Sequence, residues 1–281
     1  MTTLTSGLPD LSSDYTLEPL QVESYRRDGH VLLRSVVTPW ELAVYRSHLV
    51  AASIQGARES GIEIGVGAEG RNFVHVMNLW EKSAVAKRFS FSRRFARIAT
   101  ELMGVDGVRL YHDQCLFKES GGKRTEWHSD QDYWPVDTRN TITMWMALSK
   151  VTREMGAMRF ASGSHQAAYP GTRQFSEESD EFFGRLIAEN GYSVEWPELS
   201  PGDAIFWAGP ILHSAPGNLT ETLREVIAVI YYADGARLLR PDNVMRSHDM
   251  ERFFPGQKPG DVAASQINPL LYPIPPDGKR D

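Results

Sequence analysis

The sequence is poor in cysteine, with one residue, Cys115, among 281. A single cysteine excludes an intramolecular disulfide and is typical of proteins from a reducing compartment. Cys115 lies in the apolar run QCLF, which favours a small buried thiol. The first sixteen residues, MTTLTSGLPDLSSDYT, lack the basic and apolar regions of a secretory signal. We therefore expect a cytoplasmic protein.

The sequence also lacks long apolar runs and an excess of positive charge. No apolar run approaches the ~20 residues that cross a bilayer, and the net charge is −6. These absences argue against membrane and nucleic-acid partners. The exception is the basic run KRFSFSRRFAR at 87–97, where Phe89, Phe91 and Phe95 alternate with the charges. This alternation favours a surface helix with an apolar underside.

Many short apolar runs separated by glycine and proline predict the fold. We expect a mainly β protein with a double-stranded β-helix (a jelly roll, cupin-like) and helices packed on one face. The predicted helices are one that ends at Gly29, one that begins after Thr38, and those over 83–103 and 176–190. The chain is predicted to form one domain over 1–281, with a core at about 17–235 and an irregular tail at 255–281. The predicted strands lie within 30–37, 72–79, 107–117, 141–149, 156–164, 192–199, 203–209 and 225–233.

The segment TEWHSDQDYWP, residues 125–135, has the spacing of a metal site. On an extended segment, His128 and Asp130 would point to the same side, because side chains alternate along a strand. Two imidazoles and one carboxylate on one face of an octahedron form the ligand set of non-haem Fe(II) oxygenases. The third ligand must come from another strand, and His213 in FWAGPILHSAPGN is the best candidate. Taken singly, each histidine is more often a hydrogen-bonded structural residue.

Arg224 follows His213 by eleven residues and begins the apolar run EVIAVIYYA. A buried guanidinium needs a strong acceptor, because burial of an unpaired charge is costly. The far carboxylate of a dicarboxylic cosubstrate would supply a bidentate partner. A salt bridge to Glu221 or Glu225 is the alternative.

Over roughly residues 17–235 the sequence resembles the phytanoyl-CoA dioxygenase family of Fe(II)/2-oxoglutarate oxygenases. The resemblance rests on YRRDGHVLL, WHSDQDYWP, TMWMALSKVTREMGAMRFASGSH and PGDAIFWAGPILHSAPGN followed by LREVIAVIYYA. It implies iron held by His128, Asp130 and His213, and 2-oxoglutarate held by the iron and Arg224.

Further residues matter for the expected cosubstrate site. The resemblance places Trp145 and Gln114 beside 2-oxoglutarate, although Trp145 could equally be core packing. Many members carry a serine two residues after the distal histidine, where this chain has Ala215. Ser214 and Thr143 are the two candidates to replace that hydroxyl.

The resemblance implies an enzyme that uses O2 and converts 2-oxoglutarate to succinate and CO2. We expect hydroxylation of an unactivated C–H bond in a small organic molecule, such as a natural-product intermediate or an amino-acid derivative. Desaturation, cyclisation and epimerisation by the same cofactors stay open, as does a cupin-type metalloenzyme or binding protein without 2-oxoglutarate. The sequence does not distinguish a monomer from a homo-oligomer.

Residues that flank the expected ligands are candidates for contact with the substrate. For the aromatic ones, packing in the barrel core is the alternative. Asp132 would serve as a second carboxylate, either solvated or directed at an amine or hydroxyl of the substrate. The candidates are Tyr111, Phe117, Asp132, Tyr133, Trp134, Arg159, His165 and Trp207.

Overall fold

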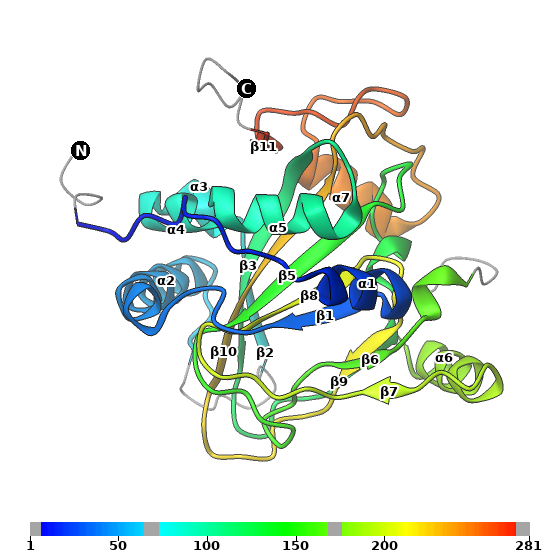
Figure 1. Ribbon diagram of the computed structural model, residues 1–281, viewed down its shortest axis with the longest axis horizontal. Helices are drawn as coiled ribbons and strands as arrows, with labels where there is room; N and C mark the ends of the chain where they lie inside the picture. Colours follow the sequence, from blue (N-terminus) through cyan, green and yellow to red (C-terminus); the bar gives the residue numbers. More distant parts are fainter. Residues whose placement is uncertain (1–6, 65–72, 168–175, 274–281) are drawn as a thin grey trace.

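Two antiparallel sheets face one another in the computed structural model, which describes residues 7–64, 73–167 and 176–273 (Figure 1). The larger sheet has the order β1 (His30–Leu33), β8 (Ala204–Ala208), β5 (Thr141–Ala147), β10 (Arg224–Ala233), β3 (Val108–Lys118) and β11 (Leu270–Tyr272), and β2 (Phe73–Met77) also pairs with β3. The smaller sheet has the order β4 (Thr125–His128), β9 (His213–Ala215), β6 (Arg159–Ala161) and β7 (Val194–Glu195). This is the predicted double-stranded β-helix.

The central strands β5 and β10 are buried on both faces. In β10, Ile227 and Val229 pack into the core below the helices, whereas Ala228 and Ile230 face the smaller sheet. Burial on both faces explains why these strands read as continuous apolar runs rather than alternating ones.

Helices cover the outer face of the larger sheet, as predicted (Figure 1). Helix α2 begins with a capping box in which Thr38 Oγ1 accepts from the Glu41 amide and Glu41 accepts from the Thr38 amide. The covering helices are α2 (Pro39–Glu59), α3 (Leu79–Lys82), α4 (Ala84–Ser90) and α5 (Arg93–Met103). Helix α1 (Pro19–Asp28) lies against β1 and ends at Gly29, and α6 (Glu177–Glu189) lies against β4 of the smaller sheet.

The described residues 236–273 are more ordered than predicted. Strand β11 pairs with β3, and its Leu271 is fully buried in the core. Helix α7 (Val244–Phe253) begins at Asn243, whose side chain accepts from the Arg246 amide, and it buries Met250 and Phe253. The prediction of an irregular tail is therefore wrong at 270–272, and the packed structure extends past the expected core boundary.

The basic run at 87–97 forms α4 and α5, with Phe89 and Phe95 fully buried beneath them. Arg94 turns inward to an ion pair with Glu41 at 2.8 Å.

In the described part of the chain, no helix combines the length and apolar character needed to cross a membrane. Cys115 is fully buried, and burial raises the pKa of its thiol to about 12.

Candidate metal centre and cosubstrate pocket

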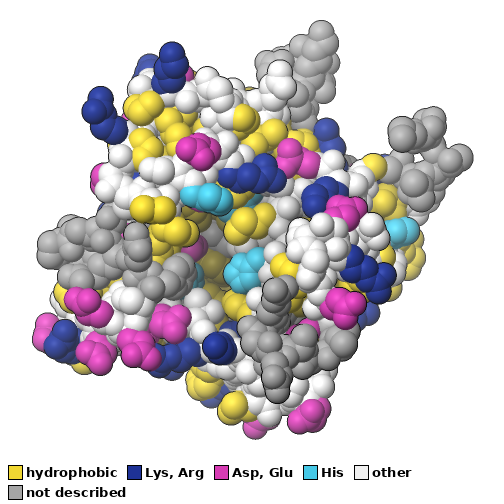
Figure 2. Space-filling model, turned by 180° about the vertical axis from the view of Figure 1, so that it is seen from behind, with side chains coloured by type: hydrophobic (Ala, Val, Ile, Leu, Met, Phe, Trp, Pro, Cys, Tyr) yellow, Lys and Arg dark blue, Asp and Glu magenta, His cyan; other side chains and the backbone are white. Residues whose placement is uncertain are grey.

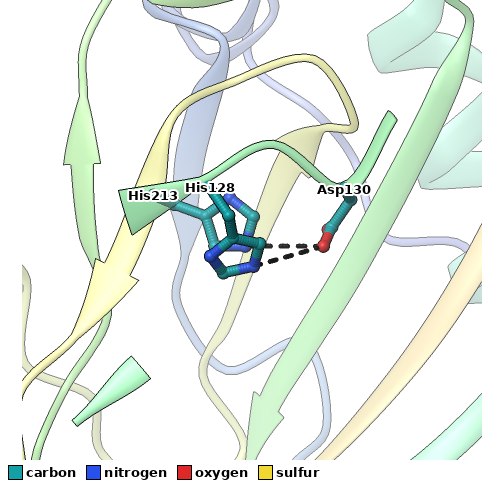
Figure 3. A group of neighbouring side chains, drawn as sticks. All are labelled: His128, Asp130 and His213. Atoms are coloured by element: carbon teal, nitrogen blue, oxygen red, sulfur yellow. Dashed lines mark ion pairs between the residues drawn. The ribbon is translucent and has the colours of Figure 1, made fainter. Parts of the chain in front are cut away.

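His128 and His213 lie directly opposite each other on the neighbouring strands β4 and β9. Asp130 does not continue strand β4 as predicted. The strand ends at His128, and Asp130 begins a short 3-10 turn (Asp130–Asp132) that is closed by the Tyr133 amide donating to the Asp130 carbonyl. The turn still directs the Asp130 carboxylate toward both histidines (Figure 3).

Three ligand atoms converge from these residues. Asp130 Oδ1 lies 3.6 Å from His128 Nε2 and 3.7 Å from His213 Nε2, and all three atoms lie within 4.8 Å of one another. The Nδ1 atoms lie 2.8 Å and 3.1 Å from the carbonyl oxygens of Glu126 and Ile211. Because a carbonyl only accepts, Nδ1 carries the proton and the Nε2 lone pair faces the carboxylate. The donor set fits a divalent transition metal.

The charge states of this cluster suit a metal at neutral pH. Burial alone would raise the pKa of Asp130, but His213, His128 and the indole N–H of Trp207 outweigh it and lower that pKa to about 2. Burial and the neighbouring His128 lower the pKa of His213 to about 4. The carboxylate is therefore ionised and the imidazole neutral, which are the forms that bind metals.

The ligands open into a cavity of about 320 Å³ between the two sheets. Seen from behind, hydrophobic and histidine side chains gather around a hollow in the surface (Figure 2). A cavity of this size is typical of small-molecule sites, which hold few polar groups among apolar ones.

Arg224 forms one end of the cavity and is 1% exposed. Its Nη1 donates to the Gly156 carbonyl at 2.5 Å, while Nε has no partner among the described residues. The guanidinium lies over the rings of Phe73 and Trp145, at 5.3 and 5.4 Å from their centroids. Burial lowers the pKa of Arg224 to about 9, and the group stays cationic at neutral pH.

The alternative of a salt bridge at Arg224 is wrong for the described residues. Glu225 binds Arg46 instead, at 2.5 Å, and Glu221 is exposed. No described carboxylate lies within ion-pair distance of Arg224. A buried cation without a protein carboxylate fits an anionic ligand.

Gln114, Thr143 and Trp145 all line the same cavity. Gln114 Oε1 and Thr143 Oγ1 are buried and have no hydrogen-bond partner among the described residues, so both are available to a ligand. Ser214, the other candidate for the missing serine, accepts from Arg159 Nε at 3.1 Å and does not line the cavity.

The predicted substrate residues divide into two groups. Tyr133, Trp134 and Trp207 line the cavity. Tyr111, Phe117, Asp132, Arg159 and His165 are not among the described residues that line it.

Strand alternation explains two of these differences. Gln114 and Leu116 face the cavity, so Phe117 faces the helices and joins the core below them. Met158 lines the cavity, so Arg159 points outward and stacks over Trp127, 5.2 Å from its ring centroid.

The other three residues are held elsewhere by their contacts. Tyr111 is buried against the rings of Trp134 and Phe253, and its hydroxyl donates to Asp249 at 2.6 Å. His165 Nε2 lies 3.2 Å from the carbonyl of Arg26 in α1. Asp132 is buried at the end of the 3-10 turn.

Several residues that line the cavity were missed at the sequence level. They include His112 on β3 and Met245, Asp249 and Phe253 on α7. Alternation from Gln114 could have identified His112. The Asn243 cap, with apolar Met250 and Phe253 three residues apart, could have indicated the helix.

Trp207 positions the carboxylate, because its Nε1 donates to Asp130 Oδ2 at 3.1 Å. Trp207→Phe keeps an aromatic ring but removes this bond, and we expect metal affinity to fall about 10- to 100-fold. Titration with Mn(II) would measure the change. Trp80→Phe is the matched control, since Trp80 Nε1 has no described partner. Equal metal affinity in the two variants would contradict this role for Trp207.

Comparison with known proteins adds the family. The family model described as Phytanoyl-CoA dioxygenase (PhyH) matches residues 25–226, which include His128, Asp130, His213 and Arg224. The chain belongs to the phytanoyl-CoA dioxygenase family. Among curated relatives, it is 26% identical over 145 residues to the dioxygenase cnsJ of Penicillium expansum, a match covering 51% of this chain and 39% of that protein. The chain spans less than half the length of the first curated relatives it matches.

Solved structures of other proteins share the fold. The carbocyclase SnoK from nogalamycin biosynthesis superposes with a TM-score of 0.74 at 24% identity, covering 92% of this chain and 99% of that one. The epimerase SnoN, solved with Fe3+, alpha ketoglutarate and nogalamycin RO, gives 0.71 at 24% identity and covers 90% and 97%. At this identity the likeness shows the fold alone.

Proposed function

We propose that this member of the phytanoyl-CoA dioxygenase family is an Fe(II)- and 2-oxoglutarate-dependent oxygenase. One observation carries the proposal: two imidazoles and a carboxylate converge in the same cavity that buries an arginine with no carboxylate partner among the described residues. A metal site alone would not need the arginine. A dicarboxylate that binds the metal at one end and Arg224 at the other accounts for both features.

The chain's own residues would bind and orient the reactants. His128, Asp130 and His213 would hold the iron, and Arg224, whose guanidinium lies over Phe73 and Trp145, would hold the far carboxylate of 2-oxoglutarate. Bound iron supplies the oxidative decarboxylation of 2-oxoglutarate by O2, which yields succinate and CO2. The apolar walls exclude water and present one C–H bond of the substrate to the metal.

Hydroxylation of a small organic molecule is the reaction we propose. The solved relatives named a carbocyclase and an epimerase make cyclisation and epimerisation the alternatives. We also propose that the chain acts as one domain, because α7 and β11 from its last part pack on the barrel. A cytoplasmic location stays a prediction from the sequence.

Binding of 2-oxoglutarate to the Fe(II)-loaded protein without oxygen tests the proposal. We expect binding to require Fe(II) and to produce a visible metal-to-ligand charge-transfer band. Readmitted O2 and a substrate should then yield one succinate per turnover. A well-folded protein that binds Fe(II) but not 2-oxoglutarate would instead support a cupin-type metalloprotein.

A further inference from the structure

The cavity has a second end, beside α7. Along β10 the wall runs from Arg224 through Ala228 to Ile230, which pairs with His112 of β3. Six residues of strand cover about 20 Å. The indole N–H of Trp207 donates to the Asp130 carboxylate. Trp207 is the strand partner of Thr143, and Thr143 is the strand partner of Ile230. The Asp130 carboxylate therefore lies toward the end of the cavity away from Arg224. The space past the metal ligands, beside α7, is where a substrate would lie.

Asp249 of α7 places a second carboxylate in this space. It lines the cavity and is 8% exposed. Its Oδ2 accepts from the Tyr111 hydroxyl at 2.6 Å, and the Tyr111 ring packs against Phe253 and Trp134, with centroids 5.2 and 5.4 Å away. The carboxylate is therefore held in place before any ligand binds.

The described residues leave this carboxylate without a strong cationic partner. The only described basic group within 4.0 Å is His248, whose Nδ1 lies 3.7 Å from Oδ1 and whose side chain is 67% exposed. The neighbouring arginines are already paired, Arg246 with Asp242 and Arg252 with Glu81. Burial raises the pKa of Asp249 to about 6. A cation bound beside the carboxylate would lower this pKa again.

The surroundings are suited to an organic cation rather than an anion. Tyr133, Trp134 and Phe253 offer aromatic surface in the same cavity, and aromatic faces attract ammonium groups. His112 stacks on Phe253 at 4.5 Å, and burial lowers its pKa to about 4, so it adds no positive charge. Among the described lysines and arginines, only Arg224, at the opposite end, lines the cavity.

We propose that Asp249 selects a substrate that carries a protonated amine on an apolar scaffold. The inference rests on the proposed function, since it assigns the substrate class of that site. It also relocates the acidic contact that the sequence suggested for Asp132. Tyr111 is the positioning residue that orients the Asp249 carboxylate.

Binding of two matched probes, benzylamine and benzyl alcohol, tests the proposal. Ligand-observed NMR on the full chain, with Fe(II) and 2-oxoglutarate under nitrogen, would give both affinities. A charge-assisted hydrogen bond predicts that the amine binds roughly tenfold more tightly than the alcohol. Asp249→Asn should reduce this preference to about twofold or less, and Tyr111→Phe should reduce it partly. Asp106→Asn, which removes an exposed carboxylate outside the cavity, should leave it unchanged.

Any of three outcomes would overturn the inference. The preference for benzylamine over benzyl alcohol could be unchanged in Asp249→Asn, the wild type could bind both probes equally, or the wild type could fail to bind benzylamine. Ligation of the amine by the metal would survive Asp249→Asn, so that variant separates the two causes. Retained 2-oxoglutarate binding by Asp249→Asn would show that this variant is folded. If Asp249→Asn does not fold, the amine preference of Tyr111→Phe tests the inference in its place. The same probes on metal-free protein report on Asp249 even if the wild type fails to bind 2-oxoglutarate, so the two failures are distinguishable.

Discussion

Alanine in place of His213 is expected to lower Fe(II) affinity by more than about 100-fold and to abolish 2-oxoglutarate-dependent succinate formation. His213 is 2% exposed and supplies one of three convergent ligand atoms, so its loss leaves only two protein ligands. Removing a ligand should exceed the 10- to 100-fold loss typical of residues that merely orient one. Anaerobic metal titration and a succinate assay measure the two effects.

His48→Ala is the matched control for this variant. His48 is an exposed histidine on α2, away from the cavity, so its replacement should change neither metal affinity nor turnover. Undiminished Fe(II) binding by His213→Ala would remove that residue from the ligand set. Succinate formation at the wild-type rate in the variant would remove the metal assignment altogether.

Arg224→Met is expected to have opposite effects on ligand binding and stability. Within the described parts of the chain the buried guanidinium has no carboxylate partner, so 2-oxoglutarate affinity should fall by roughly 100-fold or more when its charge is removed. The ligand-free protein should melt at a higher temperature, because an unpaired buried charge costs folding free energy that a methionine does not. Calorimetric titration and thermal unfolding measure the two changes.

Arg58→Met, at the exposed end of α2, provides the control. It should leave both the melting temperature and 2-oxoglutarate affinity near the wild-type values. A lower melting temperature for Arg224→Met, together with intact 2-oxoglutarate binding, would show that the arginine is structural. Wild-type KM for 2-oxoglutarate would lead to the same conclusion.

The residues nearest the metal were the most predictable from the sequence. The pair His128 and Asp130 is close in the chain, and the apolar runs around His213 and Arg224 could be recognised as core strands. The prediction was wrong about the backbone at Asp130. The spacing of His128 and Asp130 fits a continuous strand, and it fits equally a strand that ends at His128 and is followed by a 3-10 turn. The sequence shows which side chains meet more readily than how the backbone brings them together.

The more distant wall of the cavity was less predictable. Strand β3 is buried on both faces, so apolar alternation does not show that Phe117 faces the helices. The pairing of β3 and β10 shifts between Ile230 and Tyr231, and Tyr111 is left outside the register. Such a bulge reorients the side chains beyond it, and it cannot be recognised from the amino-acid composition of the strand. Asp249 reaches the cavity because α7 packs over the barrel, and the sequence does not show this packing.

The position of α7 separates two tasks along the chain. The family match ends at residue 226, after every expected ligand of iron and 2-oxoglutarate, whereas α7 spans Val244–Phe253. Substitutions in this one helix could therefore alter which molecule is accepted while the reaction machinery stays intact. By the proposal for Asp249, the segment that selects the substrate is therefore separate in the chain from the segment that binds the cofactors.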